Sequence, residues 1–338
     1  MSAPQVSAPK VALLGAGRMG QVHGRNAARH PRLDLVSVVD PDAGLAGALS
    51  AELGCAVGSV DGVLADPAID AVLVATSTST HLDLVLAALA AGKAVFCEKP
   101  LDLDLNRLRA HATQLERPAR PLYVAFNKRF DPHYGALKRK LDAGELGALE
   151  TLNLISHDPA PPPPDFIPTS GGLFRDFSIH DFDMARWLLD EEPGELFAWA
   201  SCLVDPAIAA AGDVDTARIL LRCASGKLCM ISNTRRSGYG YDQRAEAYGS
   251  KGAAFVGNPR VAELETWTEA GALAAPIRAG FQTRHAPSYA AEVDHFAAVL
   301  AGETKPVTGY AASVAALALA EAATRSVATG APVQLADV

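Results

Sequence analysis

Between residues 10 and 120, short apolar segments alternate with segments that carry a helical pattern of apolar residues. VALLGAG, LDLVSVVD, AVLVATS and AVFCEKP are rich in valine and leucine and predict buried strands. HLDLVLAALAAG lies between the last two of these and ends on a glycine, as helices often do. Strands separated by helices in this way predict a parallel sheet of βαβ units.

The pattern changes after PLYVAFNKRF. A helical stretch, PHYGALKRKLDAG, leads to LETLNLISHDP, a proline-rich segment and the amphipathic segment GGLFRDFSIHDFD. Extended segments then follow, joined by turn sequences such as ASGK and GSKG: ELFAWASCLV, TARILLRCASG, KLCMISNTRRS, RAEAYGS and AAFVGN. A helix rich in alanine and leucine is predicted over residues 311–330. This half of the chain is therefore predicted to be α+β, with a mostly antiparallel sheet.

The length of the chain favours two domains. It has 338 residues, and single hydrophobic cores rarely grow beyond about 250–300 residues. The change of pattern falls near residues 122–127, which gives a first domain over residues 1–124 and a second over residues 125–338.

Composition and charge exclude several classes of protein. A hydrophobic fraction of 49% and a charged fraction of 20% are typical of a globular protein in water. The net charge of −8 gives no electrostatic basis for binding nucleic acid or anionic lipid. The first ten residues are too polar for a signal peptide, and no apolar run of about 18 residues predicts a membrane span. We expect a cytoplasmic protein without nucleic-acid or membrane partners.

The cysteines support the same compartment. They are odd in number, scattered, and lie in apolar segments without a CxxC motif, which predicts reduced core residues and no zinc site. The five are Cys55, Cys97, Cys202, Cys223 and Cys229.

GAGRMG matches the pattern G-x-G-x-x-G at Gly15, Gly17 and Gly20. The motif follows a predicted strand, opens a predicted helix and precedes Asp40, which ends the next strand. Dinucleotide-binding folds need this context. The first glycine makes the tight turn, the second lets the backbone approach a pyrophosphate, and the third allows close packing of helix and strand. The free N–H groups of the helix N-terminus complete the anion site.

Asp40 indicates which nicotinamide cofactor is used. Its carboxylate suits the ribose hydroxyls of NAD, whereas the 2′-phosphate of NADP would bring like charges together. That repulsion costs up to about 4 kcal/mol at roughly 4 Å and an effective dielectric near 20. Pro41 and Asp42 follow, so no arginine offsets the repulsion. NAD is the predicted cofactor.

Two further segments carry candidate chemistry. CEKPL ends a strand of the parallel sheet, where ligands collect in open α/β folds, and Lys99 within it could reach a substrate oxygen. In GGLFRDFSIHDFD, helical spacing places Asp176, His180 and Asp183 on one face. A surface lysine and a solvated helix face are the simpler alternatives.

The order of six motifs decides between these interpretations. GAGRMGxxH, VVD, ATSTSTH, EKPL, FNKRFDP and GGLFRDFSIHDFD together resemble the Gfo/Idh/MocA family of oxidoreductases over nearly the whole chain. ISHDPAPPP, DVDTARI, GYGYDQRAEAYGSKG, PVTG and LALAEAATRS resemble its inositol dehydrogenase branch. The resemblance implies an N-terminal Rossmann domain that binds NAD. It also implies a C-terminal α+β domain with a large open sheet, which binds substrate, and assembly as a homotetramer.

In that family the lysine of EKP and the aspartate and histidine of D-x-x-x-H meet around the reacting carbinol. The matching residues are Lys99, Asp176 and His180. A histidine, with a reference pKa near 6.5, can accept the alcohol proton at neutral pH. Lys99 can stabilise the developing alkoxide, and Asp176 can orient substrate hydroxyls. Groups this close would titrate as a coupled set, so the proton is accepted by the set, and naming His180 alone as the base is a simplification.

The resemblance also assigns binding residues. For the cofactor they are Gly15, Gly17, Arg18, Met19, Gly20, Asp40, Thr76, Ser77, His81, Glu98 and Lys99. For the substrate they are Asn127, Arg129, His157, Asp176, His180, Tyr239 and Tyr241, with His285 as a further candidate. Asp183 has structural and functional interpretations of equal weight. Metal dependence is rejected, because Lys99 would oppose a divalent cation and further ligands are missing.

Two positions depart from the inositol branch. His157 stands where an arginine is usual, and His285 where a tyrosine is common. The predicted reaction is NAD-dependent oxidation of a cyclic polyol, with myo-inositol giving 2-keto-myo-inositol as the first choice. Scyllo-inositol or an aldose such as glucose is the alternative substrate. A non-catalytic dinucleotide-sensing regulator is the alternative from a different class.

Overall fold

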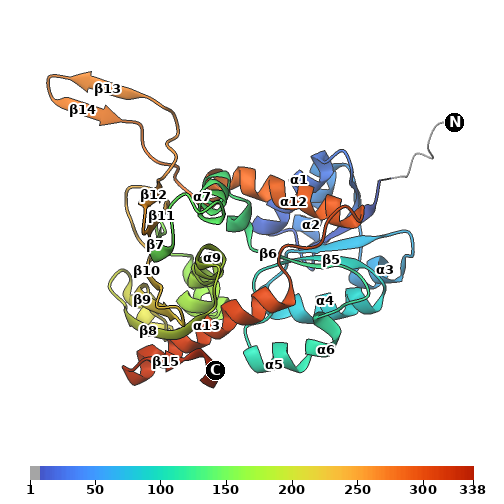
Figure 1. Ribbon diagram of the computed structural model, residues 1–338. Helices are drawn as coiled ribbons and strands as arrows, with labels where there is room; N and C mark the ends of the chain where they lie inside the picture. Colours follow the sequence, from blue (N-terminus) through green and yellow to red (C-terminus); the bar gives the residue numbers. More distant parts are fainter. Residues whose placement is uncertain (1–7) are drawn as a thin grey trace. The chain divides into compact units, whose positions relative to one another are not determined.

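The computed structural model describes residues 8–338 and divides the chain into two compact units (Figure 1). One unit contains the described residues up to Asn127 together with Tyr289–Val314, and the other contains Lys128–Ser288 together with Ala315–Val338.

The first unit is built on a six-stranded parallel sheet with the order β3-β2-β1-β4-β5-β6. Its strands are β1 (Lys10–Leu14), β2 (Asp34–Val39), β3 (Ala56–Val57), β4 (Ala71–Val74), β5 (Ala94–Glu98) and β6 (Leu122–Ala125). The central strands β1, β4 and β5 are almost completely buried, as their continuous apolar runs require. The predicted Rossmann architecture is confirmed.

Helices connect these strands in sequence. They are α1 (Arg18–Arg29), α2 (Ala43–Leu53), α3 (Val60–Ala65), α4 (His81–Ala90), α5 (Leu105–Ala110) and α6 (Ala112–Leu115), with a 3₁₀ turn η1 (Thr78–Thr80) before α4. Asp42 caps α2 and Asp104 caps α5, each by accepting two backbone N–H groups of the first turn.

The first unit also includes a segment that the sequence-based division placed in the second domain. Most of α12 (Ala286–Leu300) belongs to it. Phe296 packs against Phe96 and Tyr123, with ring centroids 5.6 and 6.4 Å apart, and the Tyr123 hydroxyl donates to Glu292 at 2.8 Å. These buried contacts explain why residues 289–314 group with the first unit although residues 125–338 were expected to form one domain.

The second unit contains a seven-stranded sheet with the order β12-β11-β7-β10-β9-β8-β15. Its strands are β7 (Leu149–His157), β8 (Pro193–Ser201), β9 (Thr216–Cys223), β10 (Leu228–Thr234), β11 (Asp242–Gly249), β12 (Gly252–Val256) and β15 (Val333–Gln334). Neighbours are antiparallel except β7 and β10, which are parallel. The prediction of a large, mostly antiparallel sheet is confirmed.

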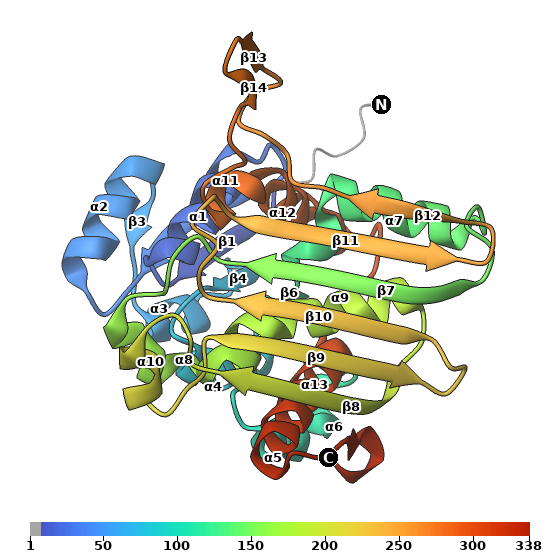
Figure 2. The same ribbon diagram turned by 90° about the vertical axis from the view of Figure 1, so that its left-hand side faces the viewer.

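One face of this sheet is covered and the other is open. Burial alternates along β9, as expected for a sheet that is buried on one side. Helices α7 (Pro132–Asp142) and α9 (Ile179–Leu189) and the C-terminal helix α13 (Tyr310–Thr329) lie behind the strands in Figure 2. The opposite face, which the figure turns toward the viewer, carries no helix of this unit.

Shorter elements complete the second unit. They are α8 (Ile167–Ser170), α10 (Pro206–Ala210), α11 (Phe281–Arg284), the turns η2 (Asn127–Phe130), η3 (Pro164–Phe166) and η5 (Leu335–Asp337), the π-helix η4 (Phe174–Ser178) and the hairpin β13 (Glu265–Thr268) and β14 (Gly271–Ala274). The turn η2 begins at Asn127, the last residue assigned to the first unit.

Helix α13 is long and apolar enough to cross a membrane by length and composition alone, with a mean hydropathy of 1.2. Half of that apolar window is buried inside the protein. Its polar side chains are used in packing, since Glu321 forms an ion pair with Arg175 and Ser326 accepts the Ala198 N–H. These contacts are those of a helix packed in a protein core.

Candidate active site

The glycine turn has the geometry that a pyrophosphate-binding loop needs. Gly15 has φ = 103°, and a Cβ there would overlap the backbone of Ala75. A Cβ on Gly20 would overlap the Gly15 carbonyl, so helix α1 can approach the strand only with glycine at this position. Gly17, in contrast, faces open space, and no side chain caps α1. The free N–H groups of this helix end therefore remain available to an anion.

Asp40 lies beside that turn. Its Oδ2 accepts the Ala16 N–H at 2.7 Å and its Oδ1 accepts the Asp42 N–H at 2.9 Å. These bonds fix the carboxylate next to the glycine loop and leave lone pairs for further donors. Arg18 and Met19 form the first turn of α1, with Arg18 exposed and Met19 half-buried.

The predicted cofactor loop after β4 is tied to the Lys-Pro turn by His81. The buried ring approaches the Pro100 carbonyl with Nδ1 at 2.8 Å and the Thr76 carbonyl with Nε2 at 3.2 Å. Burial lowers the pKa of His81 despite these two acceptors, so the ring is neutral and Nδ1–H is the better-placed donor. His81 therefore positions the loop that contains Thr76 and Ser77, which itself lies exposed before η1.

A buried pair of side chains, Glu98 and His23, contacts the backbone of Lys99. Glu98 and His23 lie 2.6 Å apart, Oε1 to Nε2, and Glu98 Oε2 accepts the Lys99 N–H at 3.2 Å. Burial alone would raise the pKa of Glu98, but the His23 hydrogen bond and charge outweigh it, and the pKa is lowered. Glu98 is thus ionised, and it fixes the backbone at Lys99.

In the second unit, Asp176 lies in a π-helix and not in the regular helix that was predicted. Gly171 and Gly172 take left-handed conformations just before it, with φ values of 84° and 83°. The π-helix Phe174–Ser178 then leads directly into α9, which carries His180. Single π turns inside helices occur frequently at functional sites. This turn changes the spacing on which the expected i, i+4, i+7 face was based.

Arg235, which the sequence did not single out, clamps Asp176. Its guanidinium donates to Asp176 Oδ2 at 3.0 Å and to Asp158 Oδ2 at 3.3 Å, and lies 5.0 Å from the Phe177 ring centroid. Arg235 is only 5% exposed. Burial raises the pKa of Asp158 to about 6, although Arg235 opposes the shift. One buried cation thus holds two carboxyl groups at the end of the covered sheet face.

Asp183 and Arg129 form a bidentate pair, with N–O distances of 2.7 and 2.8 Å. Asp183 is buried and lies 3.7 Å from Arg186 as well. Of the two roles open to Asp183, these contacts support the structural one. The same contacts occupy the Arg129 guanidinium, which was expected to contact substrate or nicotinamide.

The next carboxylate, Asp181, is the centre of a buried network. Its side chain accepts from Lys128 at 2.7 Å, Ser156 at 2.7 Å and Asn233 at 2.7 Å. All four residues are at most 5% exposed. The network joins α9 to strands β7 and β10, and it therefore fixes the helix that presents His180.

His157 is not brought together with Asp176 and His180. Along β7, Ser156 points to the covered face and contacts Asp181, so its neighbour His157 points to the open face. There His157 Nε2 lies 2.9 Å from the Ser232 hydroxyl and its Nδ1 lies 3.7 Å from Asp242. Strand alternation is the physical reason for this departure from the predicted pocket wall.

The tyrosines of GYGYDQR point in different directions. Tyr239 is 58% exposed and donates to Asp242 at 2.7 Å. Tyr241 is buried, and its ring lies edge-on to His285 at 5.7 Å. His285 in turn contacts Asp131 at 3.3 Å, and burial lowers the pKa of His285 to about 4, which makes it a neutral core histidine.

Asn127, another predicted substrate residue, is buried at the start of η2.

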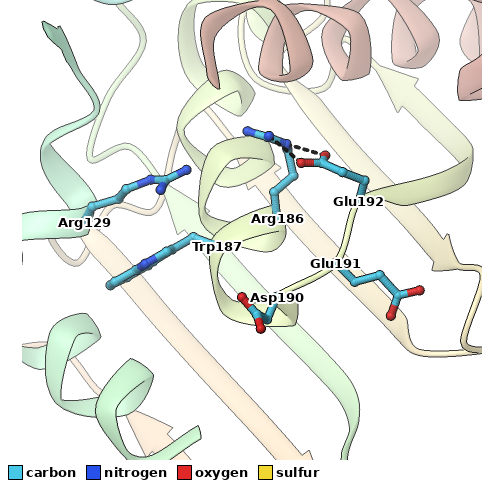
Figure 3. A pocket seen from close by; sticks show the side chains of 6 residues that line it. All are labelled: Arg129, Arg186, Trp187, Asp190, Glu191 and Glu192. Carbon is cyan, nitrogen blue, oxygen red and sulfur yellow. Dashed lines mark hydrogen bonds and ion pairs between the residues drawn. The ribbon is translucent and has the colours of Figure 1, made fainter. Parts of the chain in front are cut away.

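An open hollow of about 370 Å³ lies at the end of α9 (Figure 3). Its lining residues are Arg129, Arg186, Trp187, Asp190, Glu191 and Glu192. Two of these residues, Arg186 and Glu192, form an ion pair with each other at 2.5 Å. Arg129 is the one predicted site residue in this lining, so the hollow does not coincide with the Asp176 and His180 positions.

Among residues 8–338, no group of three or more His, Cys, Asp or Glu side chains is arranged to hold a metal ion. Asp176, His180 and Asp183, whose spacing resembles a ligand set, do not form such a group.

Comparisons with known proteins extend this picture. Residues 9–126 match the model of the oxidoreductase family with an NAD-binding Rossmann fold, GFO_IDH_MocA, and residues 134–255 match that of the GFO/IDH/MocA C-terminal domain. An inositol 2-dehydrogenase from Rhizobium meliloti is 45% identical over 94% of this chain and 96% of its own length.

Two further relatives belong to the same group. A scyllo-inositol 2-dehydrogenase (NAD(+)) from Bacillus subtilis is 39% identical, with 96% of each chain covered. The crystal structure of a myo-inositol dehydrogenase from Corynebacterium glutamicum superposes with a TM-score of 0.93 at 39% identity. That match covers 97% of this chain and 99% of the other.

Proposed function

The chain belongs to the Gfo/Idh/MocA family of NAD-dependent oxidoreductases, and from this premise we propose that it oxidises an inositol at a secondary alcohol. The observation that carries the proposal is the likeness to inositol 2-dehydrogenase over nearly the full length of both chains. Myo-inositol is the proposed substrate and its 2-ketone the product. Scyllo-inositol is the second candidate, because a relative with that name is 39% identical.

The first unit supplies the cofactor site. The Gly15–Gly20 turn and the uncapped start of α1 fit a pyrophosphate, and Asp40 fits the adenosine ribose. Bound NAD supplies the hydride acceptor. Thr76 and Ser77 are proposed to follow the cofactor along the edge of the sheet, where ligands bind in open α/β folds.

The proposed chemistry at the alcohol uses Lys99, Asp176 and His180. Alcohol oxidation needs a group that accepts the hydroxyl proton as hydride leaves the carbon. His180 takes this role, and the Lys99 ammonium stabilises the negative charge that develops on the oxygen. Asp176, fixed by Arg235, accepts hydrogen bonds from substrate hydroxyls. Glu98, paired with His23, fixes the backbone at Lys99.

Substrate recognition is proposed to use polar groups of the second unit and of η2. A cyclitol presents a ring of hydroxyls, and an unmatched buried polar group costs about 1–3 kcal/mol. Asn127, Tyr239 and Tyr241 remain candidates for these contacts beside Asp176 and His180. Arg129 is a weaker candidate, since Asp183 already occupies its guanidinium.

Cofactor preference provides one test. NAD should exceed NADP by more than about tenfold in kcat/KM, because the 2′-phosphate would meet the fixed Asp40 carboxylate. The double variant Asp40→Ser, Pro41→Arg should have a smaller ratio of kcat/KM for NAD to kcat/KM for NADP. The measurement is initial rate against cofactor concentration. Similar efficiency of the wild-type protein with both cofactors would contradict the role given to Asp40.

Position 157 provides a second test. Because the His157 side chain lies on the open face of the sheet, His157→Arg should leave the kcat/KM ratio of myo-inositol to scyllo-inositol unchanged within about twofold, well under 1 kcal/mol. Arg235→Gln serves as the comparison, since it releases Asp176 and should lower kcat/KM for both substrates. A clear change of the ratio in His157→Arg would place that side chain at the substrate.

A substrate panel tests the function itself. The chain is incubated with NAD and, separately, myo-inositol, scyllo-inositol and glucose, and the absorbance of NADH is followed. We expect NAD to be reduced with an inositol as substrate, at a higher kcat/KM than with glucose. Reduction by glucose alone would favour an aldose dehydrogenase. NAD binding without turnover on any polyol would favour the non-catalytic regulator.

We also propose that the protein is a cytoplasmic homotetramer. The open face of the seven-stranded sheet supports self-association, since it exposes Trp199, Leu220, Met230 and Phe255. Arg222 and Glu195 lie among them as a charge pair at 3.1 Å. A face with both charges and apolar side chains suits an isologous contact with a second copy. Light scattering in solution tests this assembly.

A further inference from the structure

The hairpin β13–β14 projects away from the rest of the second unit (Figure 1). Both strands are exposed along nearly their whole length. Ladder contacts join its two sides at the root, where Val261 donates to Pro276 at 2.9 Å and Ala275 donates to Leu264 at 2.8 Å. We name residues 261–276 the arm.

The arm carries large apolar side chains on both of its faces. Trp267 is 78% exposed and Leu273 75% exposed, and Leu264 and Val261 are exposed too. Trp267 pairs with Ala272, whereas Leu273 pairs with Thr266, which places Trp267 and Leu273 on opposite faces. Packing of one face against the arm's own unit would therefore still leave the other face without cover.

An isolated two-stranded hairpin is marginally stable in water. Apolar patches that remain exposed on a folded protein usually mark interaction sites. The arm combines the two properties, since its strands lack a core and Trp267 and Leu273 face water in the single chain. A surface that covers these side chains would stabilise the hairpin.

The position and charge of the arm indicate what that surface is. In Figure 1 it extends to the side of the sheet opposite helices α9 and α13, and in Figure 2, which turns that side toward the viewer, it lies above the β11 and β12 edge of the sheet. Between Val261 and Pro276 the arm contains Glu263, Glu265 and Glu269 and no lysine or arginine. The open face carries the exposed arginines Arg218 and Arg222.

We propose that the arm packs on a second copy of this chain that is stacked against the open face of the sheet. Trp267 and Leu273 would be covered by the partner, and the acidic residues of the arm would meet its basic side chains. This contact rests on the proposed self-association but not on the proposed reaction. If no polyol is oxidised in the substrate panel, the proposed arm contact is unaffected. If the arm experiment fails, the proposed reaction is unaffected.

Trp267 allows a direct test, because the chain has three tryptophans, at positions 187, 199 and 267. In the Trp187→Phe, Trp199→Phe double variant, emission reports the arm alone. With assembly confirmed by light scattering, we expect blue-shifted emission and weak acrylamide quenching, both lost on dilution to monomers. Solvent-like emission in the assembled protein, or a wild-type chain that is monomeric at every concentration, would overturn the proposal.

A second pair of variants measures the contribution of the arm. Trp267→Ser with Leu273→Ser should raise the concentration at which the assembly dissociates by about tenfold or more, as expected for a buried tryptophan anchor. Val57→Ser is the matched control, since Val57 is 55% exposed but lies in the first unit. Equal dissociation of both variants and the wild-type protein would contradict the proposed contact.

Discussion

Lys99→Ala and His180→Ala should each lower kcat by about 10²–10⁴-fold, the usual contribution of a positioned acid–base group. The affinity for NAD should fall far less than kcat, because the pyrophosphate is assigned to the glycine turn at Gly15–Gly20 and Lys99 is one of eleven residues assigned to the cofactor. Steady-state kinetics with the preferred inositol gives kcat, and quenching of protein fluorescence gives the Kd of NAD.

Lys140→Ala is the control for removal of a lysine charge, since Lys140 is exposed and pairs only with Glu145 among the ion pairs of the described residues. It should retain wild-type kcat. If either Lys99→Ala or His180→Ala did the same, the proposed proton transfer would be wrong.

The largest loss of stability is expected for Asp181→Ala. Removing this carboxylate leaves the buried Lys128 ammonium without its ionic partner, 2.7 Å away, and also releases Ser156 and Asn233. Breaking a buried pair from one side typically costs about 3–5 kcal/mol. Denaturant unfolding measures the change in the free energy of unfolding.

Glu145→Ala is the matched comparison. The Lys140–Glu145 pair is just as short, at 2.6 Å, but both side chains are 53% exposed. Exposed pairs contribute about 0–1 kcal/mol, so this variant should unfold close to the wild-type protein. Equal losses for Asp181→Ala and Glu145→Ala would show that burial of the Asp181 network does not determine its contribution.

Local constraints in the chain made much of the fold predictable. Strands β1, β2, β4 and β5 lie in the apolar runs that the sequence displays, and β8–β12 lie in the extended segments of the second half. The glycine turn was predictable for the same reason. Its steric requirements act on the backbone itself, and only glycine meets them at positions 15 and 20.

What escaped prediction depends on partners distant in the sequence. Arg235 contacts Asp176 across 59 positions, Lys128 contacts Asp181 across 53, and His23 contacts Glu98 across 75. Such pairs leave no periodic signal in the chain. Residues 289–314 were not predicted to belong to the first unit for a similar reason. The pattern of an amphipathic helix does not specify which core the helix will join.

Two features of the site had local causes that the predicted roles of the residues did not take into account. The segment around Asp176 follows the apolar spacing of a helix, yet it forms a π turn after two left-handed glycines. His157 follows Ser156 in an extended strand, so strict alternation sends the two side chains to opposite faces. An assignment of that segment as a strand, made before its residues were given roles, would have separated them.

The central claim is that a carbinol carbon of inositol gives its hydride to NAD. Myo-inositol deuterated at carbon 2 is incubated with the protein and NAD, and the reduced cofactor is analysed by mass spectrometry. We predict that deuterium appears in NADH and that the steady-state rate falls relative to the unlabelled substrate if hydride transfer limits it. NADH that forms without deuterium, or an inositol that yields no NADH, would contradict the account.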